Sequence, residues 1–201
     1  MKLLCLGDSL TYGYDVACDY RWTTKLAKER SISVCNEGLC GDTTRGMLYR
    51  VRRMELASFD AFFFMGGSND ILMDISPSQI RQNLKAVAIL FQKQKKTVYI
   101  GIPILTKPES AAFGWQGRND VARHNEALRS HRQWLLQLAE QYHFAVVDFY
   151  GAMLQAEQDG QTNLYDDGVH PNEEGYAVMA RAAVQTLKTS ESCIAGFDDE
   201  I

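Results

Sequence analysis

Residues 2–10, KLLCLGDSL, begin with a short apolar run that stops abruptly at a glycine, an acid and a hydroxyl. The pattern recurs at 32–36, where ISVCN precedes EGLCGDTT, and at 59–65, where FDAFFFM precedes GGSND. Continuous apolar runs of this length are typical of strands that are buried on both faces of a parallel sheet. We therefore expect strands at 2–6, 32–36 and 59–65, each followed by a polar turn.

Segments with helical spacing separate the expected strands. In one of them Ile80, Leu84, Val87 and Phe91 are spaced by four, three and four residues, which places them on one helix face. Helices are expected in this way at 20–30, 43–57, 77–94, 119–142 and 173–188, further strands at 97–102 and 144–149, and long loops at 103–117 and 157–171. Alternating strands and helices joined by right-handed crossovers predict a flavodoxin-like, three-layer α/β/α sandwich around a five-stranded parallel sheet.

The composition is that of one ordinary globular domain. Of the 201 residues, 46% are hydrophobic and 23% are charged, which excludes a mainly disordered or fibrous chain. No apolar run approaches the roughly 18–20 residues that span a bilayer, so we expect no stable membrane association. We expect a single domain over residues 1–188, a polar tail at 189–201, and a monomer or small homo-oligomer.

The charge balance argues against nucleic acid as a partner. The chain has 21 basic and 25 acidic residues, a formal net charge of −4, whereas nucleic-acid binders usually carry a basic surplus. Arg45, Arg50, Arg52 and Arg53 form a local basic cluster. With no nucleic-acid-binding signature beside it, this cluster is best explained as the solvated face of a helix.

The cysteines indicate a reducing compartment. Cysteine occurs at an odd number of positions with irregular spacing and no C-x-x-C pair, which gives no support to a disulfide framework or a zinc site. These positions are Cys5, Cys18, Cys35, Cys40 and Cys193. The polar residues after Leu6 also interrupt the first apolar run too early for a secretory signal. We therefore expect a cytoplasmic protein.

The turns after the strands carry the parts of a serine hydrolase. In parallel sheets, ligands bind where the carboxyl ends of the strands meet. That edge should hold the hydroxyl of Ser9, the backbone of Gly41, the amide of Asn69, and Asp167 placed three residues before His170. A serine needs a base to remove its proton, and the base needs a carboxylate to orient it.

Other candidates for the base and the carboxylate are weaker. His124, His131 and His143 lie in or beside an expected helix, where a lone histidine is usually structural. Asp166 is adjacent to Asp167, but a separation of three residues in a tight turn suits the contact with His170 better. Asp167 and His170 are therefore the expected pair.

Four ordered sequence blocks carry a resemblance to a known family. They are GDSL at Gly7 to Leu10, the glycine Gly41 within NEGLCGDTT, GSND at Gly67 to Asp70, and DGVHP at Asp167 to Pro171. In these blocks, from residue 1 to about residue 188, the chain closely resembles the GDSL, or SGNH, hydrolase superfamily. The sequence around Gly41 and Asn69 is most similar to that of small single-domain bacterial esterases and thioesterases.

The resemblance implies the SGNH type of α/β fold and a role for each matched residue. Ser9 would be the nucleophile, His170 the base and Asp167 the residue that orients it. The backbone N–H groups of Ser9 and Gly41 and the side-chain amide of Asn69 would form the oxyanion hole. The implied activity is cleavage of small or short-chain carboxylic esters or thioesters through an acyl-enzyme, with neither metal nor cofactor.

The substrate remains open at this point, with carboxylesterase, arylesterase, thioesterase, lysophospholipase and carbohydrate O-acetylesterase as alternatives within the family. Candidate substrate-binding residues are Leu10, Tyr12, Trp115 and Val169, and Tyr14 lies close to them in the sequence. A flavodoxin-like nucleotide- or cofactor-binding module is an alternative from another class, disfavoured because no G-x-G-x-x-G occurs. A catalytically silent carbohydrate-binding or scaffold module is a third, disfavoured by the complete set of matched residues.

Overall fold

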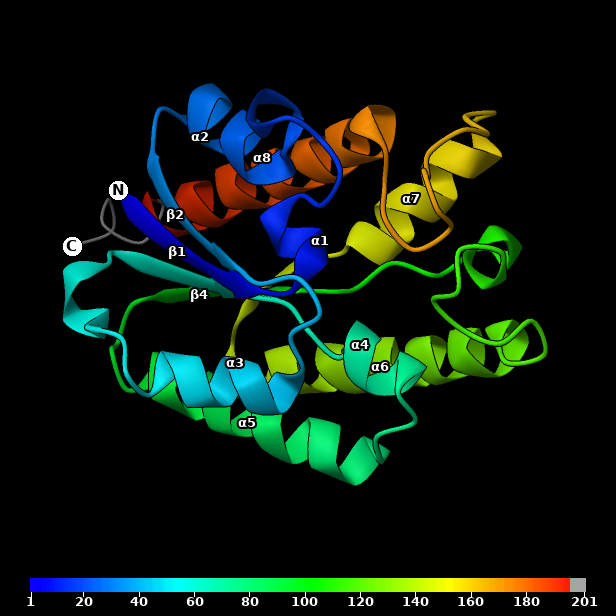
Figure 1. Ribbon diagram of the computed structural model, residues 1–201. Helices are drawn as coiled ribbons and strands as arrows, with labels where there is room; N and C mark the ends of the chain where they lie inside the picture. Colours follow the sequence, from blue (N-terminus) through cyan, green and yellow to red (C-terminus); the bar gives the residue numbers. More distant parts are fainter. Residues whose placement is uncertain (196–201) are drawn as a thin grey trace.

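The computed structural model describes residues 1–195 and contains the expected five-stranded parallel sheet (Figure 1). The strand order is β2-β1-β3-β4-β5, and every neighbouring pair is parallel. The strands are β1 (Lys2–Gly7), β2 (Ser33–Gly38), β3 (Ala61–Phe64), β4 (Thr97–Gly101) and β5 (Ala145–Val147). All five carboxyl ends therefore lie at one edge of the sheet.

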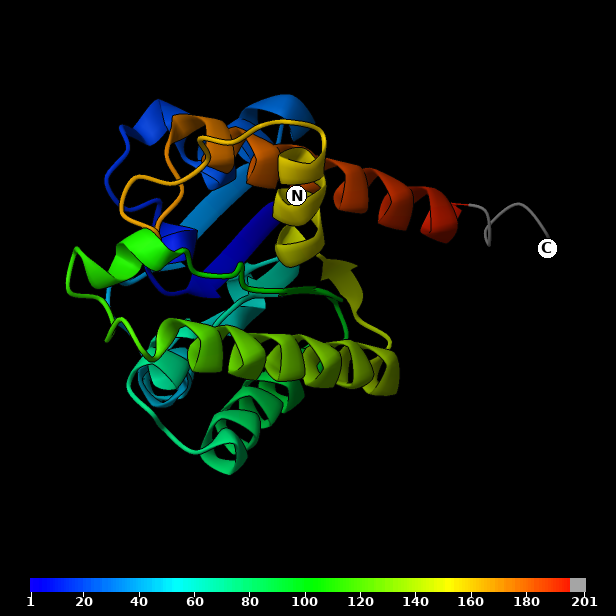
Figure 2. The same cartoon turned by 90° about the vertical axis from the view of Figure 1, so that its right-hand side faces the viewer.

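Helices cover both faces of the sheet (Figures 1 and 2). One layer is α2 (Trp22–Arg30), α7 (Phe149–Gln158) and α8 (Glu173–Ala195), and the other is α3 (Thr44–Val51), α5 (Pro77–Gln92) and α6 (Val121–Tyr142). Along β1, Leu3 and Cys5 pack into the first layer, whereas Leu4 and Leu6 pack into the second. Both faces of the strand are thus buried, which explains its continuous apolar sequence. The three-layer α/β/α sandwich is confirmed.

The helix that sequence spacing defined best is confirmed in detail. Ser76 caps α5, and its hydroxyl accepts a hydrogen bond from the backbone N–H of Gln79 at 3.3 Å. The four residues expected on its inner face, Ile80, Leu84, Val87 and Phe91, are all buried.

Two elements end earlier than expected, and a different element follows each of them. The helix expected at 43–57 stops at Val51, and a short 3₁₀ helix (Leu56–Ser58) follows before the chain turns into β3. The strand expected at 144–149 stops at Val147, since the Asp148 carboxylate accepts a hydrogen bond from Gly151 N–H at 3.0 Å and caps α7. The helix α7 was not expected.

The C-terminal helix is longer than expected. It continues through residues 189–195, where the hydroxyl of Ser190 donates to the carbonyl of Thr186 at 2.9 Å and keeps a polar side chain compatible with the helix. The remainder of the expected tail, residues 196–201, lies outside the described residues. Within residues 1–195, no helix has the length and the hydropathy needed to cross a membrane.

Two short helices at the carboxyl edge of the sheet were also not expected. They are α1 (Ser9–Tyr12), directly after β1, and α4 (Ser68–Leu72), after β3, and both lie at the same end of the sheet in Figure 1. Each helix begins inside one of the glycine-rich segments. The sequence pattern there is typical of a turn, although the backbone has already entered a helix.

Candidate active site

Ser9 is placed by the turn from β1 into α1. The carboxylate of Asp8 caps this helix by accepting a hydrogen bond from the backbone N–H of Leu10 at 3.0 Å. An aspartate is among the preferred residues for that position. Ser9 therefore begins the helix at the carboxyl edge, with 5% of its surface exposed.

His170 connects Ser9 to Asp167 through both of its ring nitrogens. Its Nε2 lies 2.9 Å from the Ser9 hydroxyl oxygen, and its Nδ1 lies 2.7 Å from Oδ2 of Asp167. The imidazole is almost fully buried. The three side chains form a continuous hydrogen-bonded chain, and its geometry allows the imidazole to take the hydroxyl proton while the carboxylate holds the ring.

The turn before α8 fixes the carboxylate of Asp167. Its Oδ1 accepts the backbone N–H groups of Val169 at 2.9 Å and His170 at 2.7 Å, leaving Oδ2 for the ring. Burial opposes ionisation of Asp167, but hydrogen bonds from the His170 ring and from both N–H groups outweigh it and hold the pKa of this carboxyl below its usual value. Gly168 has a φ of 80°, and a side chain there would collide with the backbone of Ser110.

Asp166 is not the partner of His170. Its backbone N–H donates to the carbonyl of His170 at 3.0 Å, and no contact joins its carboxylate to the ring within the described residues. Burial, with the neighbouring charges of Asp15 and Asp167, raises the pKa of Asp166. The structure therefore selects between two adjacent carboxylates as the three-residue spacing predicts.

Backbone donors lie free at the same edge. Within residues 1–195, the N–H groups of Ser9 and Gly41 have no hydrogen-bond acceptor. Gly41 is exposed and has a φ of 75°, and a side chain placed on it would meet nothing within 4 Å. The backbone conformation favours glycine here, and the open space leaves its N–H accessible to a bound molecule.

Asn69 faces the Gly41 loop from the first turn of α4. Its Nδ2 donates to the carbonyl of Asp42 at 2.9 Å, and the amide has a second hydrogen to offer. The next residue, Asp70, accepts the hydroxyl of Thr44 at 2.7 Å and the N–H of Thr44 at 2.9 Å. The block GSND is thus tied twice to the loop that carries Gly41.

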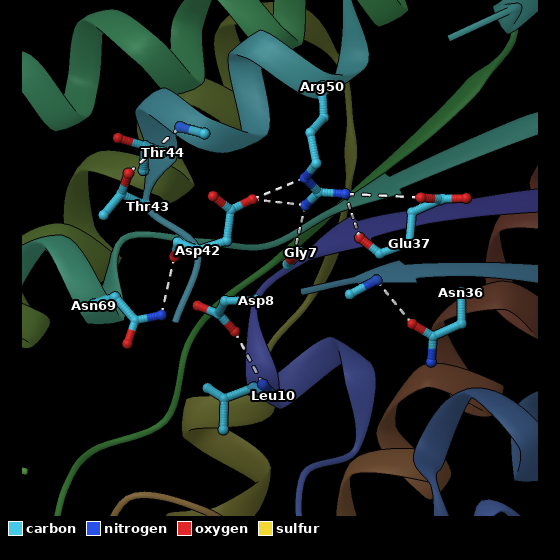
Figure 3. A network of polar contacts seen from close by, with 12 residues as sticks. Gly7, Asp8, Leu10, Asn36, Glu37, Asp42, Thr43, Thr44, Arg50 and Asn69 are labelled. Carbon is cyan, nitrogen blue, oxygen red and sulfur yellow. Dashed lines mark hydrogen bonds and ion pairs between the residues drawn. The ribbon is translucent and has the colours of Figure 1, made fainter. Parts of the chain in front are cut away.

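Arg50 holds the Gly41 loop against the strand ends (Figure 3). Its guanidinium donates to Oδ2 of Asp42 from two nitrogens, at 2.9 and 2.7 Å, and to the carbonyls of Glu37 and Gly7, each at 3.0 Å. One side chain therefore joins the ends of β1 and β2 to the loop. The sequence analysis placed Arg50 on a solvated helix face, which is wrong, because four hydrogen bonds turn it inward.

Asp8, the residue before Ser9, has a carboxyl group whose pKa is strongly raised. It is fully buried, and its Oδ2 has no hydrogen-bond partner within the described residues. Burial raises the pKa of Asp8 to about 7, and the negative charges of Asp70 and Asp42 act in the same direction. Near neutral pH this side chain therefore exists partly in its uncharged form.

Two aromatic rings flank His170. Tyr14 lies tilted over the imidazole, with ring centroids 4.3 Å apart, and Trp115 meets it edge-on at 5.1 Å. Tyr14 and Trp115 also contact each other, edge to face, at 6.2 Å. Sequence reasoning proposed Trp115 as a substrate contact but left Tyr14 undecided. The only sequence feature that pointed to Tyr14 was its aromatic side chain a few residues after Ser9.

The other candidate substrate residues are placed less favourably. Leu10 is 2% exposed, and its side chain packs in the core beside α2, so it offers a ligand little surface. Val169 is also buried. Tyr12 is 39% exposed but lies under the guanidinium of Arg21, 4.2 Å from its ring centroid. Of the four candidates, Trp115 alone contacts a residue of the hydrogen-bonded chain through its ring.

The two histidines of α6, His124 and His131, are buried and make contacts that stabilise the fold. His131 is buried, its Nε2 lies 3.0 Å from the carbonyl of Gly66, and burial lowers its pKa to about 4. His124 Nδ1 lies 2.6 Å from Gln116, which is next to Trp115. Both histidines therefore support turns beside the candidate site. Among the side chains that the structure describes, no three of His, Cys, Asp or Glu gather as metal ligands would.

Comparison with known proteins identifies relatives of the chain. Residues 5–178 match the model of the GDSL-like Lipase/Acylhydrolase family. An arylesterase of Vibrio mimicus is 25% identical over 192 residues, covering 92% of this chain and 88% of that protein. Thioesterase 1/protease 1/lysophospholipase L1 of Escherichia coli K12 is 25% identical over 181 residues, covering 89% of this chain and 79% of that protein.

Solved structures share the same architecture. A lipolytic G-D-S-L family protein from Veillonella parvula superimposes with a TM-score of 0.79 at 28% identity, covering 94% of this chain and 98% of the other. The acetylxylan esterase Axe2 from Geobacillus stearothermophilus gives a TM-score of 0.75 at 19% identity, covering 92% and 93% of the two chains. At that identity the second likeness concerns the fold alone.

Proposed function

The chain belongs to the GDSL-like lipase/acylhydrolase family and is an ester-cleaving hydrolase, and we propose that Ser9, His170 and Asp167 carry out its reaction. The observation that carries this proposal is the contact of 2.9 Å between the Ser9 hydroxyl and Nε2 of His170. Asp167 supports the assignment by accepting the opposite ring nitrogen at 2.7 Å.

In the proposed first step, the Ser9 oxygen attacks the carbonyl carbon of the ester. Nε2 of His170 takes the hydroxyl proton, and the carboxylate of Asp167 stabilises the imidazolium that forms. The imidazolium then gives this proton to the departing alcohol or thiol, which leaves an acyl group on Ser9. Water, activated by the same imidazole, releases the acid and restores the enzyme.

The oxyanion of each tetrahedral intermediate would be held by three donors. We propose the free N–H groups of Ser9 and Gly41 together with the second amide hydrogen of Asn69. These donors are held in place before substrate arrives, because Arg50 and Asp70 fix the loop that carries Gly41. Donors fixed in advance stabilise the charge that develops in the transition state without a cost of reorganisation.

For the substrate, we propose small or short-chain esters and thioesters. Arylesterase and thioesterase or lysophospholipase activities appear in the names of the relatives, and an acetylated carbohydrate is the alternative. We also propose a cytoplasmic protein that acts as a monomer or small homo-oligomer. The free thiols of Cys5, Cys18, Cys35 and Cys40 support a reducing compartment.

Covalent labelling tests the nucleophile. A fluorophosphonate should add once per chain, and peptide mapping should locate it on Ser9. Ser9→Ala should fold normally, take up no label and hydrolyse p-nitrophenyl acetate at least a thousandfold more slowly, since it removes the attacking atom. Ser68→Ala, which changes another buried serine at the same edge, is the control and should label fully. Label on a cysteine, or full activity without the Ser9 hydroxyl, would refute the assignment.

A further inference from the structure

A groove of about 1050 Å³ lies between α3 and α5, outside the hydrogen-bonded chain of Ser9, His170 and Asp167. Its lining comes from α3 and the residues that flank it, from α4 and the segment that joins it to α5, and from the N-terminal half of α5. The lining residues are Thr43, Arg45, Leu48, Tyr49, Arg52, Arg53, Asp70, Ile75, Gln79 and Asn83. We call it the α3/α5 groove.

Three arginines give the α3/α5 groove its charge. Arg45, Arg52 and Arg53 are exposed, and none of them forms an ion pair with a side chain that the structure describes. They belong to the basic cluster seen in the sequence, from which Arg50 is removed by its bonds to Asp42. The guanidinium of Arg53 lies 3.5 Å from the ring centroid of Tyr49, which holds it along the groove.

The lining holds little negative charge to oppose them. Asp70 is the one carboxylate among the lining residues, it is fully buried, and both of its oxygens accept hydrogen bonds from Thr44. Burial raises the pKa of Asp70 above its usual value. Gln79 and Asn83 add neutral polar groups on the opposite wall. The groove is therefore locally positive, although the chain as a whole has a net charge of −4.

Two lining residues of the α3/α5 groove are sequence neighbours of residues at the proposed oxyanion hole. The lining residue Thr43 directly follows Asp42, and the lining residue Asp70 directly follows Asn69. Asn69 and Asp42 are themselves joined by a hydrogen bond of 2.9 Å. From there α3 leads away from the edge at about 1.5 Å per residue, so Arg45 lies nearest the edge, whereas Arg52 and Arg53 follow the far end of the helix at Val51.

From this placement we propose that the α3/α5 groove is a substrate subsite that binds a phosphate group in the alcohol or thiol part of the ester. The inference rests on the proposed function. Guanidinium groups are planar forks whose N–H donors match phosphate oxygens in pairs, which makes unpaired arginines in a groove a recognition site for phosphate. A substrate whose ester lies at Ser9 would extend across Asn69 and place its phosphate among Arg45, Arg52 and Arg53.

Matched substrates test the subsite through the reaction. Acetyl-CoA and S-acetyl-N-acetylcysteamine share the thioester, but only the first carries phosphates. Likewise, 1-hexanoyl lysophosphatidic acid and 1-monohexanoylglycerol differ by one phosphate. Wild-type protein should prefer the phosphorylated member of at least one pair. The pair that responds distinguishes a soluble phosphorylated thiol from a lipid headgroup.

Variants assign any preference to the groove. Arg52→Gln/Arg53→Gln, and Arg45→Gln alone, should lower kcat/KM for the preferred phosphorylated substrate roughly tenfold or more, mainly through KM, because they remove charge-assisted hydrogen bonds. Their kcat/KM for the unphosphorylated partner should stay within about twofold. Lys93→Gln/Arg181→Gln removes two charges outside the groove and should change neither value. Raising the NaCl concentration should weaken the preference, since exposed charges are screened.

Binding provides a readout that does not depend on hydrolysis. Calorimetry should detect binding of CoA or of glycerol 3-phosphate to the wild type and at least a tenfold weaker affinity in Arg52→Gln/Arg53→Gln. Failure to cleave any ester, with binding intact, would refute the proposed function and leave the subsite standing. Normal cleavage of p-nitrophenyl acetate without arginine-dependent preference or binding would overturn the subsite alone. Equal losses on both members of a pair would also overturn it.

Discussion

Arg50 binds Asp42 through two nitrogens on one carboxylate oxygen, with Nε at 2.9 Å and Nη2 at 2.7 Å from Oδ2. The same guanidinium donates to the carbonyl of Gly7, two residues before Ser9 (Figure 3). The planar guanidinium donates from all three of its nitrogens. It therefore holds the loop that carries Gly41 at a fixed distance from Ser9. A lysine has the same charge but cannot make these contacts together.

Arg50→Lys should consequently slow the reaction without abolishing folding. We expect kcat for p-nitrophenyl acetate to fall roughly 10- to 100-fold with little change in KM, because misplaced donors weaken transition-state binding. Steady-state kinetics beside a thermal melt would measure both effects. Arg52→Lys, at the exposed C-cap of the same helix, is the matched control and should behave as the wild type. A change confined to KM would show that Arg50 acts on substrate binding instead.

Asn69→Ala tests the side-chain donor. Loss of one oxyanion donor should lower kcat by roughly a hundred- to a thousandfold, with KM almost unchanged, because the bond strengthens only as the oxyanion forms. The amide also tethers Asp42, so a melt of the variant should accompany the kinetics. Asn83→Ala, which removes a buried amide from α5, controls for loss of packing near Thr44. An Asn69→Ala enzyme with normal kcat would exclude Asn69 from the oxyanion hole.

The pair Asp166 and Asp167 offers a comparison between neighbours. Asp167→Asn should lower kcat/KM by about 10⁴-fold, because an amide in its place favours the wrong tautomer of His170. Asp166→Asn should keep most of the activity, since its side chain does not contact the ring. In the wild type, kcat/KM should fall on acidification, because an imidazolium cannot accept the Ser9 proton. Comparable losses in both variants would refute the assignment of Asp167.

Asp8 should make stability depend on pH. Its pKa is raised to about 7 by burial, whereas an aspartate in an unfolded chain titrates near about 3.9. Between these values the folded protein binds more protons than the unfolded chain, so the free energy of unfolding falls as the pH rises from about 4 to about 7. The contribution of Asp8 is therefore fully present below that window and lost above it.

Asp8→Asn isolates this contribution. The amide oxygen can still accept the N–H of Leu10, but the side chain stays neutral, so the variant should melt at a higher temperature than the wild type at pH 8. The advantage should disappear near pH 4. Asp19→Asn, an exposed residue paired with Lys28, is the control and should follow the wild-type curve. Parallel curves for Asp8→Asn and the wild type would contradict the prediction.

Acyl chain length should be limited if the rings of Tyr14 and Trp115 supply the apolar surface beside His170. Within the described residues, loop 103–117 contains one short 3₁₀ helix, Pro108–Ala111, and no amphipathic helix that could act as a lid. Each buried methylene adds only about 0.8 kcal/mol. We expect p-nitrophenyl acetate and butyrate to be good substrates, activity to fall beyond about eight acyl carbons, and no jump in rate at an emulsion boundary. Greater activity on long-chain triglycerides would show that this loop opens and closes as a lid.

The sequence could predict features that depend on local spacing. The separation of Asp167 from His170 predicted which of the two adjacent carboxylates contacts the ring, and the spacing from Ile80 to Phe91 predicted the buried face of α5. Contacts between segments that are distant in the chain could not be predicted from the sequence. Arg50 looked like part of a solvated cluster, because its partners Gly7 and Asp42 meet it only after the sheet has formed. Tyr14 reaches His170 for the same reason, from 156 positions away in the printed sequence.

Ser9 and His170 meet although 161 positions separate them along the chain. In the order of synthesis Ser9 therefore precedes its proposed base His170, which is added only after all five strands have been made. If His170 is the base that we propose, a nascent chain that ends before it carries a Ser9 hydroxyl that is not activated for attack on an ester. The order of these residues thus delays the proposed activation of Ser9 until β5 and the turn before α8 have been made.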